Sequence, residues 1–121
     1  MRIVIGGPGE QQTALLRAQI SQCLARRGMA AELVPASSPA RLRELFVAGA
    51  FQGAIIGFGS TEGFLCARWL RETDPECRVV LMDDTERFAI QGLRLHLSDF
   101  LVRPCGSERL CKAMERLMGL D

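Results

Sequence analysis

The sequence predicts one α/β domain built on a parallel β-sheet. Three observations support this fold class: short hydrophobic runs alternate with amphipathic helical patterns, five such pairs follow one another, and the links between them are short. With 121 residues and 48% hydrophobic content, the chain is long enough to bury a single core. We therefore expect residues 1–121 to form one domain with helices on both faces of its sheet.

The first strand–helix pair surrounds a glycine-rich turn. A buried strand over residues 2–6 leads through Gly6-Gly7-Pro8-Gly9 into a helix over residues 10–27. Gly28 is expected to end this helix, because glycine is the usual residue just beyond a helix C-terminus.

Helix-start signals mark the second and third pairs. A short strand over residues 32–35 precedes Ser38-Pro39, which supplies an N-cap and a first-turn proline for the next helix. The third strand, residues 52–58, leads through Gly59-Ser60 into a helix that ends at Asp74-Pro75. Each helix carries apolar residues at helical spacing, so each is expected to pack one face on the sheet.

The last two pairs complete the predicted sheet. Residues 78–82 form the most hydrophobic strand, and a weaker helix over about residues 85–95 follows it. The fifth strand, residues 99–102, ends at Arg103-Pro104, and Ser107 is expected to cap the last helix.

Composition excludes several functional classes. A net charge of +1 predicts no basic patch for nucleic acid or for an anionic membrane, and no apolar stretch is long enough to span a bilayer. The five cysteines, Cys23, Cys66, Cys77, Cys105 and Cys111, lack the spacing of a metal site or of a Cys-x-x-Cys redox motif. We expect no metal and no cofactor.

The cysteines also bear on packing and compartment. Cys23, Cys66 and Cys111 fall in helical patterns, where a free thiol packs as a small apolar group. A reducing cytoplasm is the expected compartment, and Met1 leads straight into a strand, so no signal peptide is expected.

The whole chain resembles a known family, and the resemblance is specific from about residue 77 onward. The strand over residues 78–82, the helix with Phe88-Ala89-Ile90, the strand entry Ser98-Asp99-Phe100-Leu101 and the basic residue before Pro104 stand in the order of bacterial response-regulator receiver domains. The branch that precedes LytTR-type DNA-binding domains is the most similar. The resemblance implies a CheY-like (flavodoxin-like) parallel sheet of order 2-1-3-4-5 and a role in two-component signal transduction or a phosphorelay that regulates transcription.

The residues at the strand ends depart from the chemistry of that family. Receivers hold Mg²⁺ on two acids after the first strand, phosphorylate an aspartate after the third, and end the fourth and fifth strands with Ser or Thr and with Lys. Placed on this pattern, Gly7 and Pro8 replace the acids, Gly57 the acceptor, Asp83 the hydroxyl residue and Arg103 the lysine. Glycine and proline offer no side-chain oxygen to a hard cation, and position 57 carries no nucleophile. The resemblance therefore implies a degenerate pseudo-receiver that is not an enzyme.

Two of these replacements suggest a substitute interaction. If the fourth and fifth strands are neighbours, their ends lie about 5 Å apart, and Asp83 and Arg103 can form a bidentate pair there. One hypothesis is that this pair holds a single conformational state permanently. The other is that it is an exposed ion pair of little consequence.

The leading functional hypothesis is phosphorylation-independent protein interaction. The partner would be a second copy or an effector domain, such as a LytTR-type DNA-binding domain in the same parent chain. The chain itself is not expected to bind nucleic acid or a membrane. The expected interface joins charged and apolar residues of the fourth helix, fifth strand and fifth helix: Arg87, Gln91, Arg94, Phe100, Arg109, Lys112 and Arg116. An ordinary solvated face is the alternative.

Two other hypotheses stay open. Backbone N–H groups of Gly6, Gly7 and Gly9 could hold an anion or a nucleotide, but the turn lacks the Lys-Ser/Thr of a P-loop and the third glycine of a dinucleotide fingerprint. A tight turn left after loss of the acids is the simpler interpretation. Asp84 is either an N-terminal acid for the next helix or a non-standard phosphoacceptor.

Overall fold

Strands and helices alternate throughout the chain, as predicted. The computed structural model describes residues 1–120. Its strands are β1 (Arg2–Gly6), β2 (Glu32–Ala36), β3 (Gly53–Ile56), β4 (Arg78–Asp83) and β5 (Asp99–Val102). Its helices are α1 (Gly9–Arg26), α2 (Pro39–Ala48), α3 (Ser60–Thr73), α4 (Ala89–Arg94) and α5 (Ser107–Leu117).

The five strands form one parallel sheet of order β2-β1-β3-β4-β5, which confirms the predicted topology. β1 pairs with β2 on one side and with β3 on the other. The turns after β1 and β3 therefore leave the same edge of the sheet side by side. In open α/β sheets this edge, outside the carboxyl ends of the strands, is where ligand sites lie.

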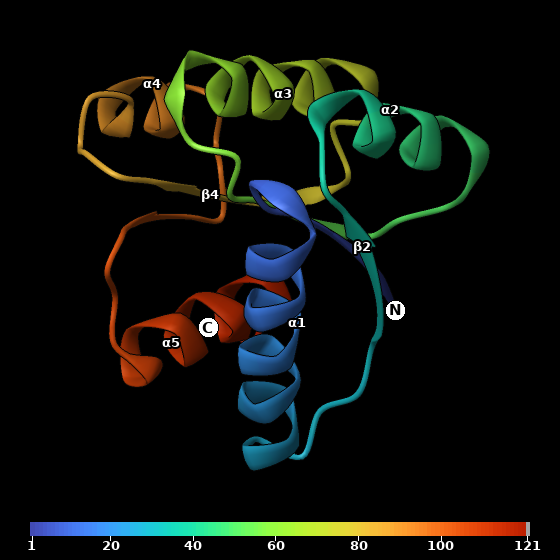
Figure 1. Ribbon diagram of the computed structural model, residues 1–121, viewed down its shortest axis with the longest axis vertical. Coiled ribbons are helices and arrows are strands. Elements are labelled where there is room, and N and C mark those ends of the chain that lie inside the picture. The colour runs from blue at the N-terminus through green and yellow to red at the C-terminus, as the bar shows by residue number, and fades with distance from the viewer. Residues whose placement is uncertain (121) are drawn as a thin grey trace.

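Helices cover both faces of the sheet (Figure 1). α1 and α5 pack on one face, while α2, α3 and α4 lie on the other. Strand side chains alternate between the two layers, because successive residues of a strand point to opposite faces. In β1, for example, Ile3 and Ile5 face α1 and α5, whereas Val4 belongs to the opposite cluster.

One predicted helix start is confirmed, and two others differ from the prediction. The Ser38 hydroxyl accepts a hydrogen bond from the Arg41 N–H at 3.2 Å, as an N-cap should. Ser107, in contrast, is the first residue of α5, and Gly106 occupies the cap position. α4 begins four residues later than the predicted residue 85, so Asp84 is not an acid in its first turn.

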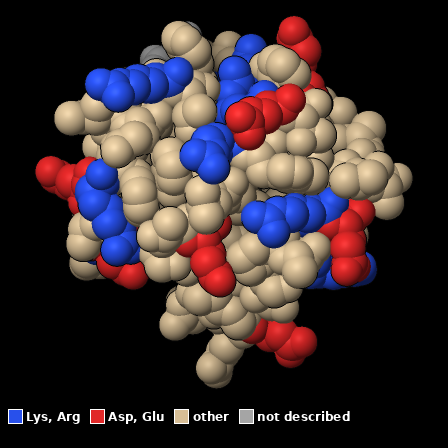
Figure 2. Space-filling model, turned by 90° about the horizontal axis from the view of Figure 1, so that it is seen from above, with Lys and Arg blue, Asp and Glu red and all other residues tan. Residues whose placement is uncertain are grey.

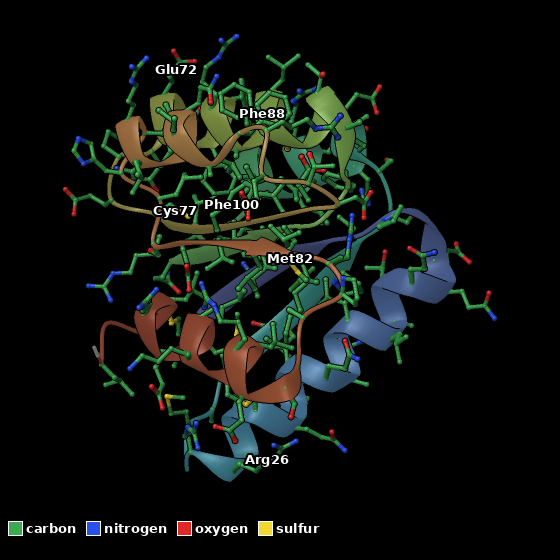
Figure 3. All side chains as sticks on the ribbon, turned by 90° about the vertical axis from the view of Figure 1, so that its left-hand side faces the viewer. Arg26, Glu72, Cys77, Met82, Phe88 and Phe100 are labelled. Atoms are coloured by element: carbon green, nitrogen blue, oxygen red, sulfur yellow. A yellow bond between two sulfur atoms is a disulfide. The ribbon has the colours of Figure 1, made fainter. Side chains whose placement is uncertain are left out.

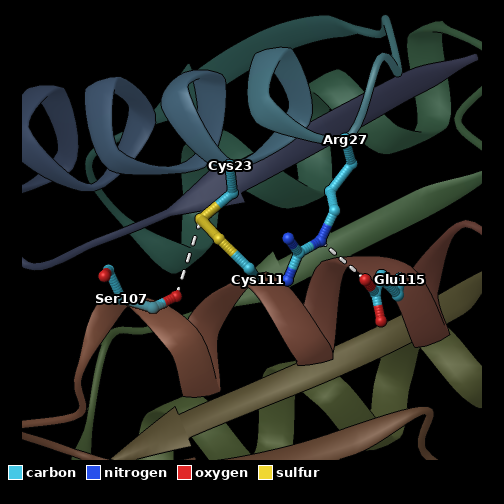
Figure 4. The surroundings of a disulfide bond; sticks show 5 residues. All are labelled: Cys23, Arg27, Ser107, Cys111 and Glu115. Atoms are coloured by element: carbon cyan, nitrogen blue, oxygen red, sulfur yellow. Dashed lines mark hydrogen bonds and ion pairs between the residues drawn. A yellow bond between two sulfur atoms is a disulfide. The ribbon is translucent and has the colours of Figure 1, made fainter.

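The expectation of free thiols is wrong for two cysteines. Cys23 of α1 and Cys111 of α5 form a disulfide bond (Figure 4). Cys66, Cys77 and Cys105 are free. The bonded cysteines are 88 residues apart, so no local spacing indicates the bond. It forms because both lie on the buried faces of two helices that pack together on the same side of the sheet.

Candidate functional site: the carboxyl edge of the sheet

The predicted site residues meet at the carboxyl edge of the sheet. The N–H of Gly57, just after β3, donates to the carbonyl of Gly6 at 2.7 Å, which places the β1 and β3 ends in contact. Asp83 pairs in register with Val102, so Arg103 emerges directly beside it. The residues that the receiver resemblance assigned to one site therefore lie together.

Arg103 spans the space beside the acceptor position. Its Nη1 donates to the carbonyl oxygen of Gly57 at 2.7 Å, and its Nε donates to Oδ1 of Asp84 at 3.1 Å. The same Nη1 lies 3.5 Å from where a β-carbon on Gly57 would stand. The guanidinium thus borders the place that a side chain at position 57 would occupy.

The predicted pair of Asp83 with Arg103 is wrong. Asp83, only 1% exposed, binds Arg87 instead: Nε donates to Oδ2 at 2.9 Å and Nη2 to Oδ1 at 3.0 Å. The N–H of Asp84 also donates to Asp83 Oδ1 at 2.7 Å. Arg87 lies in the loop before α4 and reaches both carboxylate oxygens, whereas Arg103 turns toward Gly57 and Asp84.

The Asp83 carboxylate is held in its charged form. Burial would raise its pKa, but the hydrogen bonds from Arg87 and from the Asp84 N–H outweigh burial and hold the pKa below its ordinary value. The fourth strand therefore ends in a buried carboxylate with both oxygens bound, at the position that the resemblance matched to a hydroxyl residue.

The glycine turn is shaped by close packing. A β-carbon on Gly6 would come within 2.5 Å of the Phe58 ring, and one on Gly7 within 2.8 Å of Thr13 Oγ1. The N–H of Gly7 donates to the Ala36 carbonyl, and the Gly7 carbonyl accepts from the Thr13 hydroxyl. Because the Gly7 N–H already has a partner, the geometry favours a tight turn over an anion cradle. Gly9, the first residue of α1, has a φ of +80°, a conformation that glycine adopts without strain.

The donor set at this edge does not fit a hard divalent cation. Within residues 1–120, no three His, Cys, Asp or Glu side chains cluster as metal ligands would. Gly7 and Pro8 supply no side-chain oxygen, and the carboxylates of Asp83 and Asp84 are each paired with an arginine.

A groove of about 640 Å³ opens from this edge along α1 and the start of α5. Gly7, Pro8 and Arg103 line one end of it, and a stripe of α1 side chains lines one wall. Sequence reasoning did not find this groove. The signal was a row of polar residues at helical spacing on α1.

The predicted interface residues fall on α4, β5, α5 and the adjoining loop, but several are bound within the chain. Arg109 binds Asp99 through both oxygens, at 2.6 and 2.7 Å, and Arg116 approaches the same carboxylate at 3.1 Å. Burial would raise the pKa of Asp99, but these arginines and the Phe100 N–H hold it below its ordinary value. Phe100 and Arg116 are half-buried, and five predicted members are exposed: Arg87, Gln91, Arg94, Arg109 and Lys112.

Two apolar residues on α4 were missed. Ile90 and Leu93 are 64% and 76% exposed, although both are large aliphatic side chains. Their spacing of three residues places them on the same side of a helix, which could have revealed them in the sequence. They add an apolar centre to the predicted charged face.

Charged side chains are interspersed on the face formed by α2, α3 and α4 (Figure 2). Blue and red groups lie side by side there, without a broad area of one sign. In residues 1–120, no helix has the length and apolar character needed to cross a membrane.

Comparison with known proteins identifies the fold. No family model matches the chain, and no curated protein matches it. Among solved structures, the non-phosphorylated HemR receiver domain from Leptospira biflexa has 15% identity and a TM-score of 0.79, covering 99% of this chain and 95% of that chain. The response regulator TrrA from Thermotoga maritima, in complex with Mg²⁺-BeF, has 14% identity and a TM-score of 0.77, covering 96% and 97%. An orphan response regulator of H. pylori has 16% identity and a TM-score of 0.74, covering 97% and 96%. The chain has the fold of these domains.

Proposed function

We propose that this chain, which has the receiver fold without the acceptor carboxylate, is a pseudo-receiver that signals without phosphorylation. The observation that carries the proposal is the end of β3. Position 57 is a glycine, and its carbonyl is bound by Arg103 at 2.7 Å. An acyl phosphate needs a carboxylate nucleophile at that point. The proposed domain is accordingly a binding module and not an enzyme.

The neighbouring residues support the same conclusion. Asp83 stands where the receiver pattern has a hydroxyl, and both of its oxygens are bound by Arg87. A carboxylate there repels a phosphoryl group and cannot donate a hydrogen bond to it while ionised. Arg87 binds Asp83 and Arg103 binds Asp84, so both acids of this edge have partners without any ligand.

The proposed output is a protein contact through the face of α4, β5 and α5. Ile90 and Leu93 supply exposed apolar area, and Arg94 and Gln91 lie on the same short helix. An apolar centre with a polar rim is the usual composition of a protein interface. The partner is a second copy or an effector domain, such as a LytTR-type DNA-binding domain in the same parent chain.

The test is a two-dimensional NMR titration of the ¹⁵N-labelled domain with Mg²⁺ and beryllofluoride. TrrA, whose solved structure holds Mg²⁺-BeF, serves as the positive control. We expect shifts in the control and none in this chain. Shifts at Gly57, Asp83 and Asp84 would contradict the proposal and would support phosphorylation at Asp84.

A second titration, with inorganic phosphate and a nucleotide and without Mg²⁺, tests anion binding by the glycine turn. Shifts at Gly7 and Gly9 would favour the anion-binding alternative.

A further inference from the structure

The groove between α1 and α5 presents a continuous stripe of exposed side chains. α1 contributes about one residue per turn to its wall: Gln12, Leu15, Gln19, Gln22 and Arg26. At 1.5 Å of rise per residue, the stripe runs about 21 Å along the helix. In Figure 3, Met82 and Arg26 lie toward its two ends, with α1 and α5 on either side. A groove of about 640 Å³ has the size of a small-molecule site.

The polar groups of this stripe have no partner among residues 1–120. In the described part of the chain, the side chains of Gln12, Gln19, Gln22 and Arg26 make no hydrogen bond or ion pair. The adjacent Arg27 behaves differently and pairs with Glu115 of α5 at 2.7 Å. The groove therefore offers three free amides and one free cation.

The floor of the groove is apolar. Leu16, Met82 and Leu110 line it and are at most 8% exposed. Leu15 stands at the wall with 60% of its surface exposed, and no element of the chain covers it. An apolar ligand body lying against these residues would remove their remaining surface from water.

The walls are fixed before any ligand arrives. The disulfide between Cys23 and Cys111 and the ion pair between Arg27 and Glu115 tie α1 to α5 (Figure 4). Cys23 follows Gln22 and Cys111 follows Leu110, so the bond lies beside the lining residues. A preformed groove avoids the ordering cost that weakens binding to mobile surfaces.

We propose that this groove binds an elongated amphipathic small molecule that carries one acidic group. Its apolar body lies on Leu15 and the floor, the glutamine amides bind its polar edge, and Arg26 binds the acid. The only other charged side chains of the lining, Asp84 and Arg103, pair with each other, so Arg26 sets the charge preference. Such binding would let the module respond to a ligand, which goes beyond a role in protein contacts.

The experiment compares three probes of equal chain length: decanoate, decanol and decyltrimethylammonium, each below its aggregation concentration. In two-dimensional NMR titrations of the ¹⁵N-labelled chain, we expect decanoate to shift the amides of α1 residues in the stripe and of Leu110. Decanoate should bind about tenfold more tightly than decanol, because only decanoate carries a negative charge that can form an ion pair with Arg26. Equal affinities, or shifts centred on Ile90 and Leu93, would overturn the proposal.

Matched variants separate charge from apolar contact. Arg26→Gln should reduce decanoate affinity about tenfold and leave decanol unchanged, whereas Arg17→Gln, elsewhere on α1, should change neither. Leu15→Gln should weaken both probes, while Val47→Gln on α2, also exposed, should weaken neither. An equal effect of a variant and its control would overturn the assignment.

A dilution series without probe tests the competing occupant. If the stripe amides shift with protein concentration alone, a second copy occupies the groove and the small-molecule proposal is wrong. If they do not shift, the probe titrations report on a free groove. The groove experiments are independent of the beryllofluoride titration, because that titration tests the proposed loss of phosphorylation at the carboxyl edge of the sheet.

Discussion

Asp83 and Asp84 are neighbours in sequence, but their environments are opposite. Asp83 is 1% exposed and receives three hydrogen bonds, two of them from Arg87. Asp84 is 68% exposed and meets Arg103 at the rim. Arg87 is 46% exposed, but removing it would leave the buried Asp83 charge without its main compensation, whereas pairs exposed on both sides contribute little. The stability of this edge therefore depends on Asp83 and Arg87.

Replacing Arg87 with methionine should test that dependence. Arg87→Met leaves the buried Asp83 carboxylate with backbone N–H donors alone, so we expect the variant to unfold at a clearly lower urea concentration than the wild type. Arg68→Met, on the exposed face of α3, should stay within about 0.5 kcal/mol. Because the pKa of Asp83 is depressed in the folded protein, the pair stabilises at neutral pH and its contribution is lost as pH falls through that pKa. The difference between wild type and variant should shrink in acid, and a difference independent of pH would contradict the assignment.

The free cysteines should differ in reactivity. Burial raises the pKa of Cys66 to about 11, and burial together with Asp74 raises that of Cys77 to about 12. Cys105 is half-exposed in the loop before α5. Since the thiolate is the reactive form, Ellman's reagent at mildly alkaline pH should modify one thiol in the native protein and three after unfolding without reductant. Modification of all five after unfolding would mean that the disulfide is absent.

Among the helices, α1 and α5 are joined by a covalent bond as well as by packing. The disulfide closes a loop of 88 residues, and such a constraint reduces the entropy of the unfolded chain. The Arg27–Glu115 pair lies one helical turn further along the same contact. These two contacts fix the position of α1 relative to α5, so the groove between the two helices keeps its width.

Reducing this bond should lower stability by about 2–4 kcal/mol. Thermal or urea unfolding of the wild type with and without dithiothreitol measures the effect. The double variant Cys23→Ala/Cys111→Ala provides the control, because reductant should not change its stability. A wild type that is equally stable under both conditions would contradict a stabilising role for the bond.

The elements were predictable where a single local signal decides them. Ser38-Pro39 fixes the start of α2, and the apolar residues of β4 make a buried strand the only reasonable interpretation. The predicted start of α4 was four residues too early. Glu86 and Arg87 favour a helix, but Arg87 binds Asp83 from the loop before the helix. Tertiary contact overrides propensity in that loop.

The sequence predicted where the candidate site lies but not which acid pairs with which arginine. Parallel strands bring their carboxyl ends to one edge, so Gly57, Asp83 and Arg103 had to meet. Two carboxylates and two guanidiniums lie within reach of one another there, and the choice among their pairings depends on loop geometry. The disulfide and the groove were not predicted either. Both depend on contacts between α1 and α5, which are distant in sequence, so no local pattern indicates them.

Over the whole molecule, the sheet separates two surfaces with different properties. The groove lies between α1 and α5 on one face, and the exposed apolar residues of α4 belong to the helical layer on the other. If α4 mediates self-association, burying Ile90 and Leu93 supplies the driving force. A charge in place of one of these residues should then abolish the contact without affecting the fold.

Leu93→Glu should convert a dimer to a monomer in analytical ultracentrifugation, whereas Val47→Glu, at a similarly exposed position on α2, should leave the dimer intact. The buried glutamate would lose its hydration in the interface without gaining a partner, which costs more than the lost apolar contact alone. Loss of association in both variants would point to a general charge effect instead of a specific face. Because the groove lies across the sheet, Leu93→Glu should also leave decanoate binding unchanged. A variant that lost both properties would show that the two surfaces are coupled through the core, and the separation of functions proposed here would be wrong.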